Sequence, residues 1–582
     1  MASRKDRSRP TPRKPGQLAQ AGNVELRSYD VGALPLINHI LDKMRLEKFL
    51  SERLPPDDPR AELPTAQGLM VMVRNVLVSR QPIYGVGEWA ARCAPDLFNL
   101  WEGELALLGD DRLGRNMVRA HVGVTPQFVI DFTSEVSGTF QLRDDEFHND
   151  STTVSFYGMY AGAAEEGQRE GRPTPAITFG HSKAHRPDLK QLLYTLTIND
   201  DGGVPVFFTT SSGNVTDDTT HRDTWDRICR LTGKRDFLYV ADCKLASKEN
   251  LAHIAARGGR FVTVLPRSRK EDESFRSRLR EAGVAAWQAV YDVTGETGEV
   301  LDQLSVCGEE SVTSDGYRLL WYRSTRKAAL DAATRARRVQ RALAALEELR
   351  SRLAGPRTRL RERSKVEEAV ERILSEHELA GAVLVRIEER EEADYRQATP
   401  GRPSERTQYV KQTRLHYELG WELDQAALSR AQREDGVFPL ISNDRKLSAE
   451  QVLRAYKRQP LVEKRFSQFK TDFAVAPVYL KDVARISGLL AVYFFALMAQ
   501  TLLERELRRA MTAAGIKSLP LYPEGRPCAR PTAHRLIELF EPLQRHVLQI
   551  GEGEPQVMVT ELTPVQRQVL ELLGLSPDSY GQ

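Results

Sequence analysis

The chain has 582 residues, a hydrophobic content of 41% and a formal net charge of +3. The length predicts several domains with sizeable cores, and the near-neutral balance excludes a polycation. Because 28% of the residues are charged, local basic patches are expected to matter more than the sum.

Cysteine usage and hydropathy predict a soluble cytoplasmic protein. The five cysteines are scattered and form no CxxC pair, which favours free thiols over a disulfide framework or a zinc site. No apolar run reaches the roughly 18 residues that a membrane span needs. The nearest, Ile486–Leu502, is expected to be a buried helix, so no membrane partner is predicted.

The N-terminal part is expected to contain a tail and a helical domain. Residues 1–27 are rich in Arg, Lys, Pro and Gly, a composition typical of a disordered basic tail. Residues 28–141 carry apolar side chains at spacings of three and four, which predicts an all-helical N-terminal domain. Its size fits helix-turn-helix DNA binding. No segment has a sharp recognition-helix pattern, so an interaction or dimerisation module is the alternative.

Residues 142–266 are predicted to form the first part of an α/β core. Glu146–Phe156 alternates and is rich in β-branched residues, as a strand should be. Asp150 interrupts this strand, and acidic residues are disfavoured there. It is therefore either a residue of a strand-end turn or a metal ligand. Leu192–Asn199 and Val204–Thr210 are predicted to pair as a hairpin.

Basic side chains gather in the segment Gly180–Gln191, GHSKAHRPDLKQ. His181 and His185 could share a metal ion only if the segment were a helix, and no third ligand of similar quality follows. We interpret the segment, with Lys183 and Arg186, as a basic loop near the active site.

A second acidic residue ends the apolar strand Asp236–Asp242. A helix should follow through Arg257, and Arg260–Leu265 should be the next strand. This arrangement places Asp242 at the carboxyl end of a parallel strand, where sites of α/β proteins form. The alternative is that Asp242 caps the helix, for which Ser247 is the better candidate.

Residues 267–435 are predicted to be a long insertion that contains strands and a helical hairpin. Arg326 to about His377 indicates two charged helices broken at Gly355-Pro356. This hairpin is expected to pack internally or against a second subunit. The predicted strands of the insertion are Ala286–Asp292, Tyr317–Arg323, Ala382–Ile387 and Arg414–Leu419.

Residues 436–512 are predicted to complete the core. Val437–Ser442 indicates a strand, and Ser448 is a candidate N-cap for the helix that follows. In the stretch YKRQPLVEKRFSQFK, Tyr456, Glu463 and Lys470 recur every seven residues, so one helix would present all three on one face. Pro460 should kink that helix. The alternative is a solvated basic helix with one charge pair.

The remaining chain predicts further helices. Val483–Met511 indicates a strongly apolar core helix. Residues 513–582 are predicted to form a C-terminal helical region, with helices at Thr532–Ile550 and Pro564–Leu573. Nothing in this region is diagnostic of a function.

Three of these motifs resemble bacterial insertion-sequence transposases of the DDE superfamily. The stretch from Tyr456 to Lys470 resembles the Y-x2-R-x3-E-x6-K signature of the IS-four-like, cut-and-paste branch, with Gln459 at the arginine position and Arg458 beside it. Asp150-Ser151-Thr152 and the segment ADCKLASKENL around Asp242 resemble the first and second catalytic Asp segments. The resemblance implies an α/β fold: an RNase H-like mixed sheet with flanking helices, interrupted by the β-rich and helical-hairpin insertion and preceded by the helical N-terminal domain.

The resemblance also implies a chemistry. Asp150, Asp242 and Glu463 would be the catalytic carboxylates and would hold two Mg²⁺ ions, for which Mn²⁺ would substitute. The partners would be transposon-end and target DNA within a homodimer, with no small-molecule substrate. The implied DNA contacts are Tyr456, Arg458, Lys470, Lys183 and Arg186.

Two questions stay open: the role of the aromatic residues in the insertion and the function of the whole protein. Aromatic residues of the insertion, with Trp287, Trp321 and Tyr322 as candidates, would either hold an unstacked DNA base or pack in the core. The alternatives to a transposase are an RNase H-like nuclease without strand transfer and a decayed or domesticated protein that only binds DNA.

Overall fold

The computed structural model describes residues 24–183, 185–281, 286–295, 298–355, 358–473 and 478–581. The chain divides into two compact units, and the second is an insertion in the first. Unit 1 comprises Met1–Phe237 and Pro460–Gln582, and unit 2 comprises Leu238–Gln459. The disorder predicted for the basic tail falls largely on residues 1–23, outside the described residues. Residues 24–27 were expected to belong to that tail but form part of strand β1 (Val24–Asp30).

Unit 1 is built around one long apolar helix, α16 (Val483–Ala513), as predicted. Helices α1, α3, α6 and α18 and strand β6 all contact it. By length and composition α16 is the one described helix that could cross a membrane, but 83% of its apolar window is buried within the protein. The other helices of unit 1 are α1 (Leu34–Met44), α2 (Leu46–Arg53), α3 (Thr65–Val78), α4 (Val86–Ala90), α5 (Glu102–Leu105), α6 (Asp110–Gly123), α7 (Pro126–Phe140), α8 (His221–Thr232), α15 (Pro460–Ser467), α17 (Ala533–Phe540) and α18 (Pro564–Leu573).

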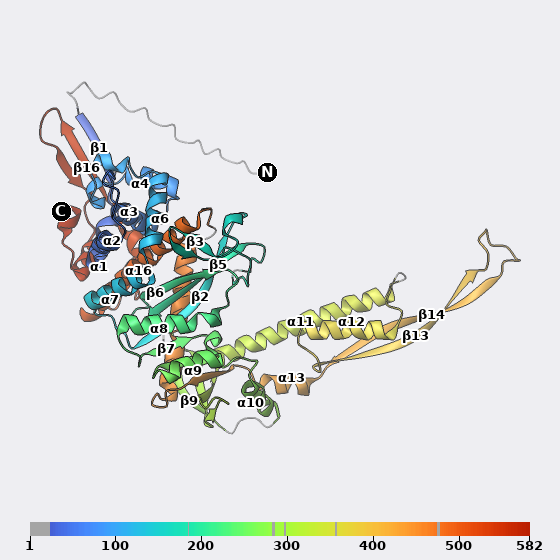
Figure 1. Ribbon diagram of the computed structural model, residues 1–582. Coiled ribbons are helices and arrows are strands. Elements are labelled where there is room, and N and C mark those ends of the chain that lie inside the picture. The colour runs from blue at the N-terminus through green and yellow to red at the C-terminus, as the bar shows by residue number, and fades with distance from the viewer. Residues whose placement is uncertain are drawn as a thin grey trace, which may run out of the picture. The chain divides into compact units, whose positions relative to one another are not determined.

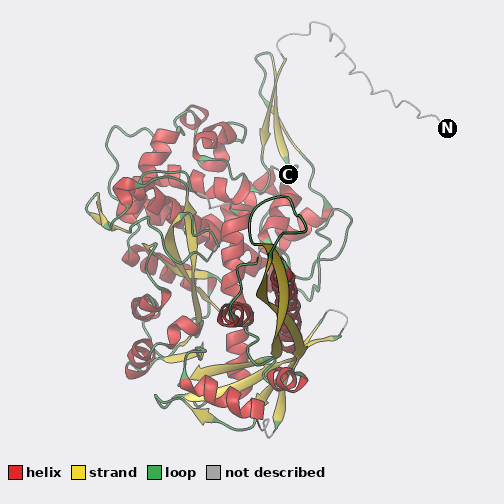
Figure 2. Cartoon of the chain, turned by 90° about the vertical axis from the view of Figure 1, so that its right-hand side faces the viewer, coloured by secondary structure: helices red, strands yellow, loops and turns green. Residues whose placement is uncertain are grey.

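Three antiparallel strands of unit 1 lie next to these helices (Figures 1 and 2). Strand β2 (Glu146–Phe156) pairs with β5 (Lys190–Asn199) from Phe147–Asn199 to Phe156–Lys190. Strand β5 also pairs with β6 (Pro205–Ser212), which confirms the predicted hairpin. The short strands β3 (Gly167–Arg169) and β4 (Arg172–Thr174) form a separate pair.

The helix predicted at Thr532–Ile550 is wrong in its second half. Helix α17 ends at Phe540, and Gln544–Ile550 is strand β16. Pro542 follows the helix end, and proline disfavours continuation of a helix. Strand β16 then pairs with β1 on one side and with β17 (Gln556–Val559) on the other.

Unit 2 contains a mixed sheet. Strand β7 (Leu238–Ala241) runs parallel to β8 (Arg260–Val264), and helix α9 (Lys248–Ala256) connects them. This confirms the predicted strand-Asp-helix-strand arrangement. The sheet continues through antiparallel pairs in the order β8, β15 (Val437–Ser442), β12 (Arg318–Ser324), β10 (Val300–Cys307) and β9 (Trp287–Thr294), with β11 (Ser311–Val312) paired to β12.

A long arm extends from unit 2. It consists of α11 (Thr325–Ala354), α12 (Arg363–Glu376), β13 (Val383–Gln397) and β14 (Tyr409–Leu423). The helices lie alongside the two-stranded ribbon, and the ribbon continues past their end (Figure 1). The helical hairpin is as predicted, whereas each strand is 15 residues long and extends well beyond its predicted bounds.

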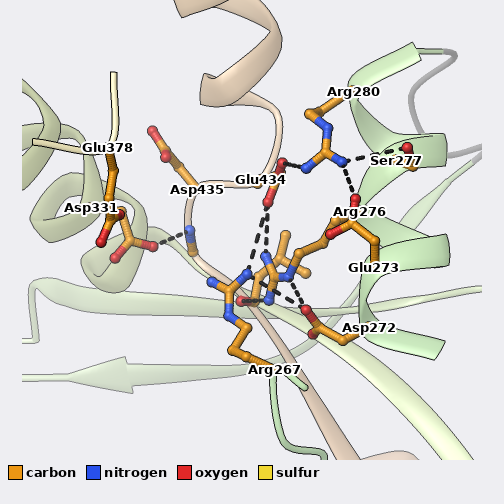
Figure 3. A network of polar contacts seen from close by, with 12 residues as sticks. Arg267, Asp272, Glu273, Arg276, Ser277, Arg280, Asp331, Glu378, Glu434 and Asp435 are labelled. Atoms are coloured by element: carbon orange, nitrogen blue, oxygen red, sulfur yellow. Dashed lines mark hydrogen bonds and ion pairs between the residues drawn. The ribbon is translucent and has the colours of Figure 1, made fainter. Parts of the chain in front are cut away.

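A polar network joins three segments at the base of the arm (Figure 3). Arg276 of helix α10 (Lys270–Glu281) is buried, and its Nε donates to Asp272 at 2.8 Å. Glu434 follows α13 (Gln425–Gln432) and accepts from Arg276 at 3.3 Å and from Arg280 at 2.6 Å. Asp331 of α11 accepts from the backbone N–H of Gly436 at 2.9 Å. The network thus ties α10 and α11 to the start of β15.

Candidate active site

Asp150 lies in the interior of strand β2. Every other residue of β2 is buried, and Asp150 alone is partly exposed. Its Oδ1 accepts a hydrogen bond from the backbone N–H of Ser151 at 2.7 Å. The strand continues for six residues beyond it, to Phe156. The explanation of Asp150 as a strand-end turn residue is therefore wrong, and its role as a metal ligand stays a prediction.

Lys183 brings two acidic residues of unit 1 together. Its Nζ lies 3.5 Å from Asp150 Oδ1 and 2.7 Å from Asp217 Oδ2. The same ammonium group donates to the backbone oxygen and to Oγ of Ser151, both at 2.8 Å. The loop of Lys183 was predicted to lie near the active site; it lies beside Asp150, and the role of Asp150 stays a prediction. Asp217 has no assigned role from the sequence, although the adjacent acidic pair Asp217-Asp218 after a hairpin was a visible signal.

A neutral histidine lies behind this cluster. Burial lowers the pKa of His221 to about 4, which outweighs the opposite effect of Asp217 and Asp218. The side-chain amide of Asn149 lies 3.4 Å from its Nδ1, and Asn149 Oδ1 accepts from Thr197 of β5 at 2.9 Å. These contacts fix the residue before Asp150 against the neighbouring strand.

Glu463 lies on α15, which packs against β2 and β5. Its side chain is exposed, whereas Val462 and Phe466 on the same helix are buried. Helix α15 begins at Pro460, a position that suits proline because the first turn of a helix needs no backbone donor there. The carboxylate is thus presented on the outer face of a helix whose other face is fixed to the strand of Asp150.

The stretch from Tyr456 to Lys470 is not one helix. Helix α14 (Ala449–Lys457) ends in a turn at Arg458-Gln459, and a π-helical turn spans Gln468–Asp472. The predicted common face of the three signature residues is therefore wrong. The physical reason is Pro460, which has no backbone N–H and disfavours a helical turn before it, so the helix breaks where a kink was predicted. The candidate N-cap Ser448 is confirmed, since it forms a capping box with Gln451.

Lys470 lies in the π-helical turn, a distortion that often marks functional sites. The neighbouring Phe469 is buried and stacks on Tyr194 of β5 with ring centroids 4.6 Å apart. Burial lowers the pKa of Lys470, the positive charge of Lys183 lowers it further, and Asp150 opposes both. Within unit 1 the structure thus brings Asp150, Lys183 and Lys470 into one electrostatic neighbourhood.

A buried ion pair holds the helix of Glu463 in place. Arg465, two residues after Glu463, lies 3.3 Å from Glu504 of α16. Its Nε and Nη2 donate to the backbone oxygens of Gly203 and Gly202, at 2.9 and 2.6 Å. This pair was not predictable from the sequence, because an Arg in a basic helix gives no sign that it is buried.

Asp242 lies in unit 2, at the carboxyl end of β7. Its side chain accepts from the backbone N–H of Lys244 at 2.9 Å, so it caps the short 3-10 helix Cys243–Ala246. Ser247 caps α9 by accepting from Asn250 at 3.2 Å. From the sequence, Asp242 and Ser247 were rival candidates to cap one helix. In the structure each caps its own: Asp242 caps the 3-10 helix and Ser247 caps α9.

The remaining predicted DNA contacts occupy different settings. In unit 2, Tyr456 is half-buried with its ring 6.4 Å from that of Phe438, and Arg458 is partly exposed. In unit 1, Arg186 is exposed and donates to Asp188 at 2.8 and 2.6 Å and to the Tyr157 hydroxyl at 3.1 Å.

Two of the three aromatic candidates of the insertion are core residues. Trp321 is buried and stacks on Phe275 with centroids 3.8 Å apart and planes within 6°. Tyr322 is also buried and donates from its hydroxyl to the backbone oxygen of Ala449 at 2.8 Å. A role for either in holding a DNA base is therefore wrong. Trp287 is partly exposed.

The side chains near Asp150 supply some of the ligands that a divalent cation needs. Asp150 and Asp217 offer carboxylate oxygens, the ligands that Mg²⁺ prefers, and the ammonium group of Lys183 already places a positive charge between them. Among the described residues, no group of three or more His, Cys, Asp or Glu side chains is arranged to hold a metal ion. The segment of His181 and His185 is not helical, so the metal pair considered for it is wrong.

An α/β chain with an acidic residue inside a buried strand and basic side chains around it is consistent with an enzyme that acts on nucleic acid. The chain belongs to the transposase DDE domain family, whose model matches residues 149–499, more than half of the 582 residues. The match begins in β2 and ends in α16, so it includes all of unit 2. No curated protein matches the chain. Membership implies a nucleic-acid-processing enzyme, and such enzymes typically use divalent metals.

Proposed function

We propose that the protein is an insertion-sequence transposase of the IS-four-like branch with an RNase H-like core. It binds the terminal inverted repeats of its element, cleaves DNA there and joins the 3′-hydroxyl end to target DNA. The observation that carries this proposal is Asp150. It is the one partly exposed residue of a buried strand, Lys183 contacts it, and the helix of Glu463 packs on the same strand.

The chemistry is a pair of in-line phosphodiester displacements. Water is the nucleophile of the first step, and the freed 3′-hydroxyl is the nucleophile of the second, so no covalent intermediate with the chain forms. Asp150, Asp242 and Glu463 would hold two Mg²⁺ or Mn²⁺ ions. When bound, these ions supply the charge that stabilises the attacking and leaving oxygens.

The basic residues would hold the DNA. Lys183 contacts Asp150, and Lys470 is near enough for the charges of Asp150 and Lys183 to act on its pKa; both lysines would contact phosphates of the transposon end. Arg186, Tyr456 and Arg458 would extend this contact. The helices within residues 28–141 would provide further DNA binding, and the active complex would be a homodimer. The protein would act in the bacterial cytoplasm and associate with the nucleoid when bound.

Cleavage of the element's own end tests the proposal. A labelled duplex that carries this end is incubated with the full chain in Mg²⁺ or Mn²⁺, and with EDTA. Wild type should nick the end only with metal. Asp150→Asn, Asp242→Asn and Glu463→Gln should each abolish nicking and retain binding, because only a carboxylate charge is lost. Glu450→Gln is the matched control, since Glu450 is a partly exposed carboxylate on α14 that pairs only with the neighbouring Arg454 among the ion pairs of the described residues; it should cleave like wild type.

The outcomes separate the candidate functions. Nicking followed by strand joining supports a transposase, whereas nicking without joining indicates a nuclease of the same fold. Binding without nicking in wild type indicates a decayed DNA-binding protein and makes Gln459→Arg the next variant. Full activity in one carboxylate variant would remove that residue from the site.

A further inference from the structure

The two halves of the ribbon in the arm carry opposite charge. The inner half, residues 383–392 and 415–423, contains two Arg against six Glu, a net charge of −4. The outer half, residues 393–414, contains five Lys or Arg against two Asp or Glu, a net charge of +3. We call residues 393–414 the distal ribbon. The sharp reversal of charge within one hairpin indicates that its two halves have different environments.

The inner half is supported by helices. Val383 and Leu419 are buried in one cluster with residues of α11 and α12. At the far end of this support, Arg363 at the start of α12 lies 3.6 Å from Glu389. Ion pairs join the two strands of the inner half, such as Arg390 with Glu418 at 2.7 Å. Part of the apolar surface of the inner half and several of its charges therefore have partners within the arm.

The distal ribbon has no such support. It continues past the helical hairpin (Figure 1), and its side chains, where described, are exposed or partly exposed. The strands nevertheless stay in register out to the pair Gln397–Tyr409. An isolated two-stranded hairpin is only marginally stable in water. A long unsupported ribbon is therefore expected to gain its order from a partner.

The side chains of the distal ribbon indicate the chemistry of that partner. Tyr395 lies directly opposite Lys411, and Tyr409 belongs to the same face because side chains alternate along a strand. The two tyrosines are 61% and 52% exposed. Arg402 and Arg406 lie in the connecting loop. Neither they nor Lys411 form an ion pair with any residue in the described part of the chain, so these cations remain available to an anionic ligand.

We propose that the distal ribbon enters a groove of duplex DNA. A two-stranded ribbon fits the major groove, which is about 12 Å wide. Lys, Arg and Tyr are residues that contact the phosphate backbone. The acidic inner half repels that backbone, so the contact is confined to the distal ribbon. The choice of DNA as the partner rests on the proposed function. The location of the contact rests on the reversal of charge along the ribbon and on the exposed side chains of its paired outer strands.

A salt titration of DNA binding tests this inference. Wild type and Arg402→Gln/Arg406→Gln/Lys411→Gln are compared by fluorescence anisotropy on a duplex with the element's own end and flanking DNA. Loss of three phosphate contacts should lower the slope of log Kd against log salt by about 2.7 and weaken binding at low salt at least tenfold. Tyr395→Ala/Tyr409→Ala should weaken binding with an unchanged slope, because no charge is lost.

A charge-matched variant is available on the same arm. Arg337→Gln/Arg341→Gln/Arg352→Gln removes three exposed cations from α11, and it should keep the wild-type slope. An equal loss in both triple variants would overturn the inference, because general charge would then explain the effect. An unchanged slope in the distal variant would overturn it as well.

Two further readouts keep the inference separate from the proposed function. Metal-dependent nicking by the distal variant at saturating protein should survive, because Asp150, Asp242 and Glu463 are intact. If the distal variant shows the predicted change of slope relative to wild type, but wild type never nicks, the proposed function fails and the DNA contact stands. Sedimentation without DNA should give the same mass for wild type and the distal variant. A change of mass would assign the distal ribbon to a second copy of the chain instead.

Discussion

The Arg465–Glu504 pair of unit 1 and the surface pairs of the arm in unit 2 use the same residue types in opposite settings. In unit 1, both side chains are almost fully buried, and Arg465 also donates to two backbone oxygens. In the arm, Arg363 and Glu367 approach to 2.8 Å but are each about half exposed. A short distance therefore says little about energy. Water screens the arm pair, whereas the buried pair has replaced all of its hydration with protein contacts.

The largest loss of stability is expected when one member of the buried Arg465–Glu504 pair is removed. Arg465→Ala leaves the carboxylate of Glu504 buried without its partner, which should lower the free energy of unfolding by about 3–5 kcal/mol. Urea unfolding of the full chain, followed by fluorescence and circular dichroism, measures this change. A loss below about 1 kcal/mol would show that the buried and exposed pairs do not differ in the way described.

The second largest loss of stability is expected from a substitution in the apolar core of the arm. Leu346 of α11 is fully buried in the cluster that joins α11, α12 and the inner ribbon. Leu346→Ala should destabilise this cluster by about 2–4 kcal/mol through lost burial and a cavity. Hydrogen exchange should show faster exchange within the arm and unchanged protection of α16. Leu330→Ala on the same helix is the control, because Leu330 is 60% exposed.

Lowering the pH should weaken the contribution of the buried pair to the free energy of unfolding, by less than the substitutions above. Burial alone would raise the pKa of Glu504, but Arg465, Arg508 and Lys464 outweigh it and hold the pKa below the ordinary 4.5. The unfolded chain therefore takes up the proton first as the pH falls. The contribution is complete above pH 4.5 and is lost as the pH falls below it, through the folded pKa. Unfolding free energies of wild type should decline over this range more steeply than those of Glu504→Gln; parallel curves would contradict the assignment.

The smallest effect is expected from the exposed arm pair. Arg363→Ala should change the free energy of unfolding by no more than about 1 kcal/mol, because the ion pair is screened by solvent. A double-mutant cycle with Glu367→Ala isolates the coupling between the two side chains. A coupling as large as that of Arg465 with Glu504 would remove the contrast between the two regions.

Local patterns made much of the fold predictable from the sequence. The apolar run of α16, the strand of Asp150 and the strand-helix-strand unit of Asp242 each have a periodicity or composition that only one element satisfies. Asp150 was also recognisable because an acidic residue inside a β-rich segment needs a reason. These signals depend on neighbours within about a dozen residues, the range that helix and strand periodicity covers.

The rest depends on contacts between distant segments. Arg465 donates to the backbone oxygen of Gly203, which is 262 positions away in the sequence, and no residue near Arg465 predicts that contact. Asp217 joins Lys183 across a turn and two strands. Pro460 predicted a kink near Arg458-Gln459, whereas the regular spacing of Tyr456, Glu463 and Lys470 gave no sign of the π-helical turn that contains Lys470. Charges that are buried or brought together by the fold were therefore the part that sequence reasoning could not supply.

The insertion of unit 2 into unit 1 has a consequence for synthesis on the ribosome. Helix α3 ends at Val78, but its partner α16 ends only at Ala513. At a translation rate of about 5–20 residues per second, roughly 20–90 s pass between the synthesis of α3 and that of α16, which covers its apolar side chains. Unit 2 is complete during that interval and can fold first. Until translation is nearly finished, the N-terminal helices that also contact α3, such as α1, α2 and α6, can cover only part of this surface.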